Sequence, residues 1–537
     1  MKAARTAMGI LAAVALTTAA LTACGSSTKP TGSTPRSGGK LANGKTFTVA
    51  LRSDPGNLDP DITTLGVAIS VDRYLYDPLI NLDDKGQPIA GLAQQWSADT
   101  TRASFTLRPG ITCADGSPLT ASDVAANINF VADPKSQSPL TGLYVMPGTK
   151  ATGDDATRAV TVLSAVPDSF LLVNVGNGLG IACRKGLQDR KTLTEGENGT
   201  GMFAISERVA NDHYTLTRRP NYTWGPGNWQ PDQAGLPDKV VIKIVQSETT
   251  AMNLLLSGGL NAALINGADQ QRGYARNLFH ADTQALIGEL FYNEAGGHPG
   301  QDPVVRKALT QALDLDQVGK VLTSGTGKKA TGAIRETPNP CTGDTVAGNL
   351  VGHDLDAAKA TLDAAGWTAA GDGVRSKDGK RLTVALVYAT QNGPDGASAA
   401  ELVQQVWKGL GVDVSIKGLD TPGVNQTLMG TGSWDVSMGQ LGFAVPNQLV
   451  PFVSGATPPQ GTNFAHIHNQ DYQAKVQQAA AQPGAQGCPL WEQAEESLIK
   501  AVDLVPYYDT VTPTFGVKAT FTISQDSITP GSIRMLA

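Results

Sequence analysis

Short alternating runs and short amphipathic runs follow one another along the chain from residue 47 onward. Strict alternation over 47–51 predicts a strand, and the apolar run 239–245 predicts another that is buried or half-buried. Apolar residues at helical spacing, each set preceded by a polar or proline residue that begins a helix, predict further elements. These helices are expected over 120–128, over 251–257 and from 302–303 to near Asp316.

The second half of the chain shows the same alternation of short predicted helices and strands. A helix is expected over 356–365 and is ended by Gly366. A strand over 381–388, a helix over 399–410 and a strand over 412–416 then form a β-α-β sequence. Such alternation predicts an α/β or α+β fold with mixed sheets.

Composition and charge narrow the class of protein. The 537 residues are 41% apolar and 17% charged, and the formal net charge is -6. No basic run is long enough to follow a phosphate backbone, so we expect no nucleic-acid partner. After the first two dozen residues there is no run of about 18 apolar residues, which a spanning helix would need. The length predicts two to four domains.

The N-terminus carries the most specific local signal. Lys2 and Arg5 precede an apolar stretch over 7–20, and Leu-Thr-Ala-Cys-Gly follows over 21–25. This pattern resembles a bacterial lipoprotein signal, which implies a signal peptide over 1–23 and a lipid on Cys24 that anchors the protein to the membrane. The polar, Gly- and Ser-rich segment 24–44 is then a flexible tether. A plain secretory signal that contains a cysteine is the alternative.

Several short motifs match known functional patterns but lack the surrounding residues that those functions need. Residues 39–46 match the phosphate-loop pattern, but they lie in the expected tether and a strand follows them instead of a helix. His466 and His468 are two apart, as metal ligands on a strand can be, but no third ligand is spaced nearby. Hydrolase signatures such as G-x-S-x-G and H-E-x-x-H are absent. We therefore expect no catalytic residue, metal or cofactor.

A series of motifs resembles one protein family, and it does so in the family's order from about residue 47 to about residue 520. The resemblance is to the family 5 extracellular solute-binding proteins, which include the oligopeptide and dipeptide receptors of ABC importers. Motifs that carry it are S-D-P-G-N-L-D-P at 53–60, Y-D-P-L at 76–79, P-I-A-G-L-A-Q-Q-W at 88–96, F-T-L-R-P-G at 105–110, D-G-S-P-L-T-A-S-D-V at 115–124, G-T-G-M-F at 199–203, R-R-P-N-Y at 218–222, V-R-K-A-L at 305–309 and the helix at 359–367.

The resemblance implies a two-lobed α/β fold of the periplasmic-binding-protein type (type II, class C), with mixed sheets and an extra subdomain in lobe I. Lobe I is expected over 45–76, 199–288 and 506–537, its subdomain over 77–198, and lobe II over 289–505. The chain would cross between the lobes at 290–293 and at 505–508, and these crossings would form a hinge. Implied partners are a small solute, most simply a peptide, and the permease and ATPase subunits of an ABC importer. A monomer on the extracytoplasmic face of the cell membrane is expected.

Cysteine usage agrees with export. With Cys24 assigned to lipid, Cys113, Cys183, Cys341 and Cys488 remain, an even number for an oxidising compartment. Three pairings are open from sequence alone. The domain limits implied by the family favour Cys113 with Cys183 and Cys341 with Cys488, because each pair then lies within one domain.

The family also implies where the solute binds. In lobe I the segment after the L-D-P motif matches the part of relatives that meets the ligand backbone, and it comprises Thr63, Thr64, Leu65, Gly66 and Val67. In lobe II the corresponding stretch gives as candidates Gly439, Gln440, Phe443 and Asn447, with Trp434 just before it. Trp434 and Phe443 are equally interpretable as core residues.

One feature of the binding region departs from peptide-binding relatives. These commonly have an aspartate in lobe II that pairs with the peptide ammonium, but no acidic residue occurs here between Asp435 and Asp471. Asp435 itself is interpreted as structural. An ammonium buried without a carboxylate is costly, so either another acid pairs with it or the solute is a sugar, an opine or a nickel chelate. An exported enzyme or envelope protein that reuses the fold is the remaining alternative.

Overall fold

The computed structural model of the protein describes residues 39–83, 85–369 and 371–537, which belong to one compact unit, Ser37–Ala537. The expected signal peptide, Cys24 and most of the expected tether lie outside the described residues.

One large mixed sheet runs through the fold. Its strands lie side by side in the order β18 (Asp413–Leu419), β17 (Thr383–Ala389), β19 (Val436–Gly439), β12 (Phe279–Tyr292), β20 (Leu504–Gly516), β11 (Ala262–Leu264), β1 (Thr46–Leu51), β10 (Lys239–Ile244), β9 (His213–Arg218) and β8 (Phe203–Val209). A short strand, β13 (Lys328–Lys329), also pairs with β20. The parallel pairing of β17 with β18 confirms the β-α-β unit predicted from the sequence.

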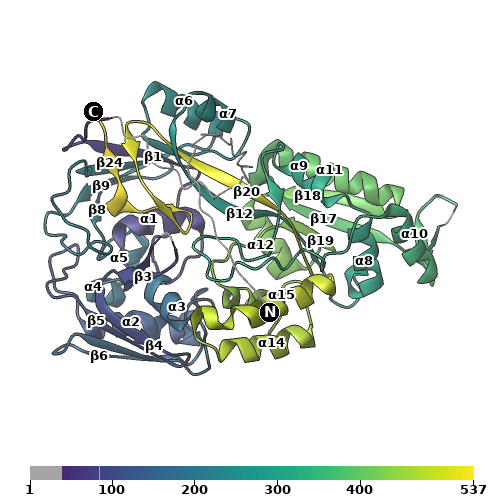
Figure 1. Ribbon diagram of the computed structural model, residues 1–537, viewed down its shortest axis with the longest axis horizontal. Helices are drawn as coiled ribbons and strands as arrows, with labels where there is room; N and C mark the ends of the chain where they lie inside the picture. Colours follow the sequence, from purple (N-terminus) through teal and green to yellow (C-terminus); the bar gives the residue numbers. More distant parts are fainter. Residues whose placement is uncertain (1–38, 84, 370) are drawn as a thin grey trace, which may run out of the picture. The chain divides into compact units, whose positions relative to one another are not determined.

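Two long antiparallel strands, β12 and β20, divide this sheet into two halves. Figure 1 shows them running together from the half that contains β1, β8 and β9 to the half that contains β17 and β18. We call the first half, with what packs on it, lobe I and the second lobe II; the exact residue limits given above stay predictions.

The pairing of β12 with β20 is irregular at one place. Its register shifts between Leu286 and Gly288 and again between Gly288 and Glu289. A β-carbon at position 288 would overlap the ring of Tyr507, so glycine lets the two strands approach there. The irregular pairing therefore lies close to the crossings that the family resemblance implies at 290–293 and 505–508.

Lobe I carries a second layer of sheet over 77–198. This sheet has the order β4 (Ala93–Ala98), β5 (Arg102–Leu107), β7 (Ala159–Leu163) and β6 (Lys150–Asp154). Its main helix, α2 (Ala121–Ala132), begins where the sequence predicts, because Thr120 and Asp123 form a reciprocal capping box. The other helices of lobe I are α1 (Gly66–Leu75), α3 (Leu171–Asn177), α4 (Arg184–Gln188), α5 (Arg190–Thr194), α6 (Glu248–Ser257) and α7 (Gln270–Ala275).

Lobe II is richer in helices. These are α8 (Pro303–Gln311), α9 (Leu315–Leu322), α10 (Leu355–Ala364), α11 (Gly393–Gly409), α12 (Thr421–Gln426), α13 (Val450–Val453), α14 (Gln470–Ala480) and α15 (Cys488–Lys500). The single helix predicted from 302–303 to near Asp316 is wrong in its end. The structure has two helices there, because the side chain of Asp314 accepts a hydrogen bond from the Gln317 amide and begins α9.

Short hairpins complete the fold. Strand β2 (Ile80–Leu82) pairs with β3 (Pro88–Ala90), and β15 (Arg375–Lys377) pairs with β14 (Thr368–Ala369) and β16 (Lys380–Arg381). Near the C-terminus β21 (Ala519–Thr520) pairs with β24 (Arg534–Met535), and β22 (Ile523–Ser524) pairs with β23 (Ser527–Ile528). The main apolar core of lobe I includes residues of this C-terminal segment, such as Phe521 and Ile533, so the chain returns to lobe I after β20.

Two disulfides join segments that are distant in the sequence. Cys113 is bonded to Cys183 in the 77–198 segment, and Cys341 is bonded to Cys488 in lobe II. These are the two pairs that the sequence analysis favours. Each closes a long loop, which restricts the unfolded chain and so stabilises the fold.

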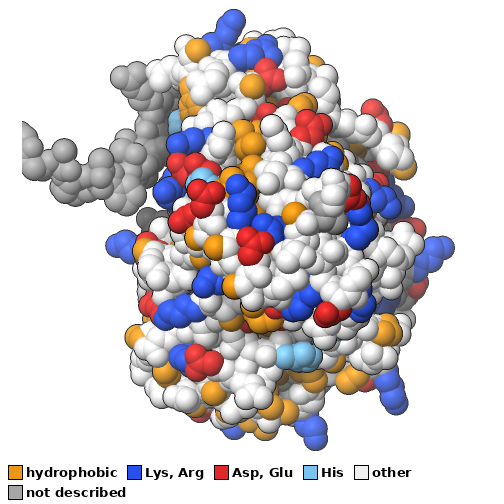
Figure 2. All heavy atoms as spheres, turned by 90° about the vertical axis from the view of Figure 1, so that its right-hand side faces the viewer, with side chains coloured by type: hydrophobic (Ala, Val, Ile, Leu, Met, Phe, Trp, Pro, Cys, Tyr) orange, Lys and Arg blue, Asp and Glu red, His pale blue; other side chains and the backbone are white. Residues whose placement is uncertain are grey.

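Surface features agree with the composition. Within residues 39–83, 85–369 and 371–537, no helix has both the length and the apolar character needed to cross a membrane. Figure 2 shows the face at the lobe II end, where Lys, Arg, Asp and Glu side chains are scattered and no continuous basic field forms.

Candidate functional site

A cavity of about 230 Å³ lies beside the β12–β20 crossing and takes its lining from both lobes. Strand β12 contributes Ala285 and Leu286, and the C-terminal segment of lobe I contributes Asp526. Lobe II contributes two segments, 335–336 and 440–443. A cavity lined from both sides of a crossing is a natural place for a small molecule.

The unpaired polar groups of this cavity are acceptors. Arg335 is committed elsewhere, because its Nε donates to Oδ2 of Asp509 at 3.1 Å. Within the described part of the chain, neither Glu336 nor Asp526 forms an ion pair, and the buried Oε1 of Gln440 has no hydrogen-bond partner. The cavity therefore contains two carboxyl groups without a cationic partner, one from each lobe, and complements a cationic group with N–H donors.

This environment raises the pKa of both carboxyl groups. Burial, followed by the charge of Asp526, raises the pKa of Glu336 to about 8. Asp526 is exposed as a residue, but protein lies close around its carboxyl group and raises its pKa, against the smaller opposing effect of the Thr283 hydroxyl. Without a cation in the cavity, the pair holds a proton near neutral pH.

The backbone of lobe II is shaped to admit Glu336. A β-carbon at Gly442 would overlap the end of the Glu336 side chain, so in this arrangement glycine leaves room for the carboxyl group. The Glu336 amide donates to the carbonyl of Phe443 at 3.2 Å, which holds the two lining segments together.

The raised pKa of Glu336 predicts how stability depends on pH. The folded protein keeps the proton to about pH 8, whereas the unfolded chain releases it near the ordinary value of 4.5, so stability is lost as pH rises through this window. We expect Glu336→Gln to melt at a higher temperature than the wild type, by a margin that grows with pH and levels off above about pH 8. Melting curves of both proteins across this range measure it. A margin that is constant with pH, as expected for the exposed control Glu401→Gln, would contradict the assignment.

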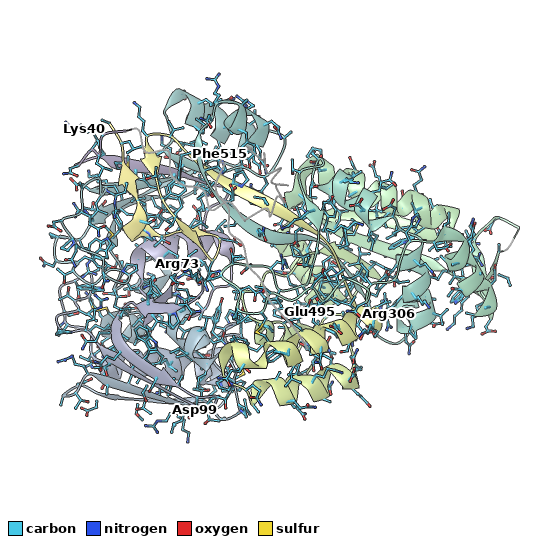
Figure 3. The ribbon with its side chains drawn as sticks, in the orientation of Figure 1. Lys40, Arg73, Asp99, Arg306, Glu495 and Phe515 are labelled. Carbon is cyan, nitrogen blue, oxygen red and sulfur yellow. A yellow bond between two sulfur atoms is a disulfide. The ribbon has the colours of Figure 1, made fainter. Side chains whose placement is uncertain are left out.

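A second, smaller cavity of about 60 Å³ lies in lobe I next to the first. Its lining includes Thr63 and Arg73, and Gln525, the neighbour of Asp526, also contributes. Figure 3 labels Arg73, which comes from α1; its guanidinium donates to the side-chain oxygen of Gln525.

The residues predicted in lobe I are dispersed over the start of α1. Thr63 is buried and lines the smaller cavity. Thr64 and Leu65 are exposed, and Gly66 and Val67 form the first turn of the helix, outside the lining of both cavities. Ligand contact by these four residues stays a prediction.

The residues predicted in lobe II divide in a similar way. Gln440 and Phe443 line the larger cavity. Gly439 is the last residue of β19 and pairs with Glu289 of β12. Trp434 is 1% exposed and packs on Phe464 in the core, which matches its alternative interpretation.

Asn447 and its neighbours join the lobes. The Asn447 side chain donates to Oδ1 of Asp168, in the 77–198 segment, at 2.8 Å. Ser169 contributes two further bonds, because its hydroxyl donates to the Ala479 carbonyl and its own carbonyl accepts from the Gly484 amide, each at 2.7 Å. Lobe I and lobe II are therefore in contact through the 77–198 segment.

Asp435 has the surroundings of a structural residue. It accepts a hydrogen bond from the Ala385 amide at 2.7 Å and pairs with Nδ1 of His298 at 2.8 Å. These partners tie β17 to the turn before β19, as the structural interpretation of this aspartate predicts.

Sequence reasoning missed the acids that the fold brings to the cavities. Glu336 and Asp526 line the larger cavity and Asp72 lines the smaller one, and none of the three belongs to a family motif. The local signals are weak: Glu336 precedes a Pro-containing turn, and Asp526 has a φ of 56°, a conformation that aspartate tolerates better than most residues. Neither signal says that the two side chains share a cavity.

Comparison with known proteins gives a family and a fold. Residues 87–462, well over half of the chain, match the model of the bacterial extracellular solute-binding proteins, family 5. The periplasmic murein peptide-binding protein MppA of Escherichia coli is 25% identical over 509 residues, which cover 88% of this chain and 89% of MppA.

Solved structures agree. The oligopeptide-binding protein AppA of Bacillus subtilis, in complex with a nonapeptide, superposes with a TM-score of 0.76 at 18% identity, covering 93% of this chain and all of that one. A substrate-binding protein of Microbacterium hydrocarbonoxydans, complexed with 4-hydroxybenzoate hydrazide, gives 0.75 at 23% identity, covering 91% of this chain and all of that one. The predicted two-lobed fold and the family resemblance are thus confirmed: the chain belongs to the family 5 bacterial extracellular solute-binding proteins.

Proposed function

We propose that this protein is a lipid-anchored, extracytoplasmic receptor of an ABC importer that captures short peptides by closing its lobes over them. The observation that carries the proposal is the cavity between the lobes, in which Glu336 of lobe II and Asp526 of lobe I have no cationic partner among the described residues. A peptide ammonium supplies the missing positive charge and several N–H donors.

The position of the two acids gives a reason for closure. A cation held by Glu336 alone or by Asp526 alone leaves one carboxylate uncompensated, whereas a cation between them interacts with both. Such contacts exist only when the lobes meet, so binding favours the closed arrangement over the open one. A permease that recognises the closed arrangement then receives only loaded receptor.

The Glu336–Asp526 pair can also substitute for the aspartate that the lobe II sequence lacks. The stretch after Asp435 lacks the aspartate of peptide-binding relatives, and the pair of Glu336 with Asp526 takes over its electrostatic role in our proposal. The name of MppA, a murein peptide-binding protein, and the nonapeptide bound to AppA support a peptide as the solute.

Anchoring and delivery complete the proposal. The lipid on Cys24 and the tether to residue 44 keep the receptor at the membrane, within reach of the permease and ATPase subunits. Metabolic labelling with palmitate tests the anchor: the wild type is expected to be labelled, and Cys24→Ser is not. Labelling of both proteins, or of neither, would contradict the anchor at this residue.

Binding is tested with residues 25–537 by calorimetric titration of tripeptides with a free amino terminus. We expect saturable binding and recovery of the peptide unchanged, as for a receptor. Cleaved peptide would contradict the receptor role, and the absence of binding to any peptide would contradict the peptide assignment.

A non-peptide solute is the second candidate. The absence of an acid between Asp435 and Asp471 favours it, and so does the 4-hydroxybenzoate hydrazide bound to the Microbacterium protein. In that case the acid pair still calls for a positively charged or N–H-rich group on the solute.

A further inference from the structure

The smaller cavity contains a carboxylate without a partner. Asp72 of α1 is 7% exposed and lines this cavity, and within the described chain neither of its carboxylate oxygens has a hydrogen-bond partner. Asn177 is 5% exposed, lines the same cavity, and has an unpartnered Oδ1; its Nδ2 donates to the Ile80 carbonyl at 3.1 Å. Buried polar atoms are ordinarily satisfied, so three orphaned acceptors around one cavity are exceptional.

The nearby cations contact other groups, although the buried Nη1 of Arg190 has no hydrogen-bond partner among the described residues. The guanidinium of Arg190 binds both Asp59 and Asp61, with a distance of 3.0 Å to Oδ2 of Asp61. Arg73 follows Asp72 on the helix, but its guanidinium donates to Gln525. Three carboxyl groups thus face two guanidinium groups, which leaves Asp72 without a cationic partner.

The raised pKa of Asp72 agrees with its lack of a cationic partner. Burial, and then the charge of Asp59, raise the pKa of Asp72 well above its ordinary value, while Arg73 opposes them only in part. A carboxylate of this kind gains most from a cation that enters the cavity and donates hydrogen bonds.

We propose that Asp72 and Asn177 form a second cation subsite, which receives a primary ammonium group on the side chain of the solute. The inference rests on the proposed function and adds a substrate class to it: solutes with two cationic groups, one between Glu336 and Asp526 and the other at Asp72. A cavity of about 60 Å³ holds more than one water-sized group, which is enough for an ammonium group.

The two cavities are close enough to serve one solute. Tyr144 lines the smaller cavity, and its pKa is raised by burial and then by the charge of Glu336 in the larger one. Gln525 and Asp526, adjacent in the chain, line one cavity each. A single extended ligand can therefore reach both subsites.

The test uses residues 25–537 and compares the tripeptide Ala-Lys-Ala with its norleucine analogue, which keeps the chain length and lacks the charge. We expect the wild type to bind the lysine peptide at least about 10-fold more tightly, and Asp72→Asn to bind the two within about 2-fold. The control Asp413→Asn, which removes an exposed acid from lobe II, is expected to keep the wild-type preference.

A second readout separates binding from structure. Removing an unpaired buried charge relieves its desolvation cost, so Asp72→Asn without ligand is expected to melt at or above the wild-type temperature. A lower melting temperature together with equal loss of affinity for both tripeptides would assign Asp72 a structural role and overturn the proposal.

A third measurement keeps the subsite separate from the peptide assignment. In the Glu336→Gln/Asp526→Asn background, ethylammonium is expected to raise the melting temperature, relative to sodium at equal ionic strength, and adding Asp72→Asn is expected to remove the effect. This result with no peptide binding would retain the subsite and reject the peptide. Equal response of the two proteins to ethylammonium, including none, would overturn the subsite, whatever tripeptides bind.

Discussion

Replacing both acids of the larger cavity, as Glu336→Gln with Asp526→Asn, is expected to weaken binding of a tripeptide with a free amino terminus by at least about 30-fold. The physical reason is that both carboxylates attract the ammonium, and the half-buried Glu336 contributes more than the exposed Asp526 because solvent screens its charge less. The amides keep the shape of the side chains and remove their charge. Calorimetric titration of wild type and variant with the same tripeptide measures the difference.

Two controls isolate the charge. The N-acetylated tripeptide has no ammonium, so it is expected to bind weakly and with the same affinity to both proteins. The pair Glu401→Gln with Asp413→Asn removes two exposed acids of lobe II and is expected to leave both affinities unchanged. If the double cavity variant weakens the free and the acetylated peptide equally, the acids shape the cavity and do not recognise the ammonium.

Arg306→Met is expected to be the most destabilising of the substitutions considered, by about 3–5 kcal/mol. The Arg306 guanidinium is buried and lies 2.7 Å from Oδ1 of Asp503 and 3.1 Å from Oε2 of Glu294. It also donates to the carbonyls of Gly300 and Val502. Methionine keeps the apolar volume but leaves two buried carboxylates without their cation.

The neighbouring residue provides a matched control for this variant. Lys307 is exposed on the same helix, so Lys307→Met is expected to change stability by less than about 0.5 kcal/mol. Urea unfolding followed by tryptophan fluorescence measures both variants. An Arg306→Met midpoint close to that of Lys307→Met would contradict the role assigned to the buried ion pairs.

Local sequence patterns predicted the helices and strands whose boundaries are set by residues nearby in the chain. The helix expected over 120–128 is α2, which Thr120 and Asp123 cap, and the alternation over 47–51 becomes β1. The helix predicted from 302–303 ends early because Asp314 caps a second helix, a choice between two local signals that periodicity does not resolve.

The candidate site was less accessible to sequence reasoning. Gln440 and Phe443 lie in a segment that the family resemblance singles out, and they line the cavity. Glu336 and Asp526 come from different lobes, and their proximity depends on the C-terminal segment returning to lobe I after β20. Asp72 would pass for an ordinary polar residue of an amphipathic helix, since only the packing around it reveals that it is buried without a partner.

Native mass spectrometry shows whether the lobes close on a solute through its positive charge. The protein would be purified from its own membranes under mild conditions, and its ligand released by denaturation and treated with an amine-selective reagent. We predict a set of peptide masses, each with at least one reactive amine, and their loss from the Glu336→Gln/Asp526→Asn variant. A retained solute without an amine or other cationic group, carried equally by both proteins, would contradict the account.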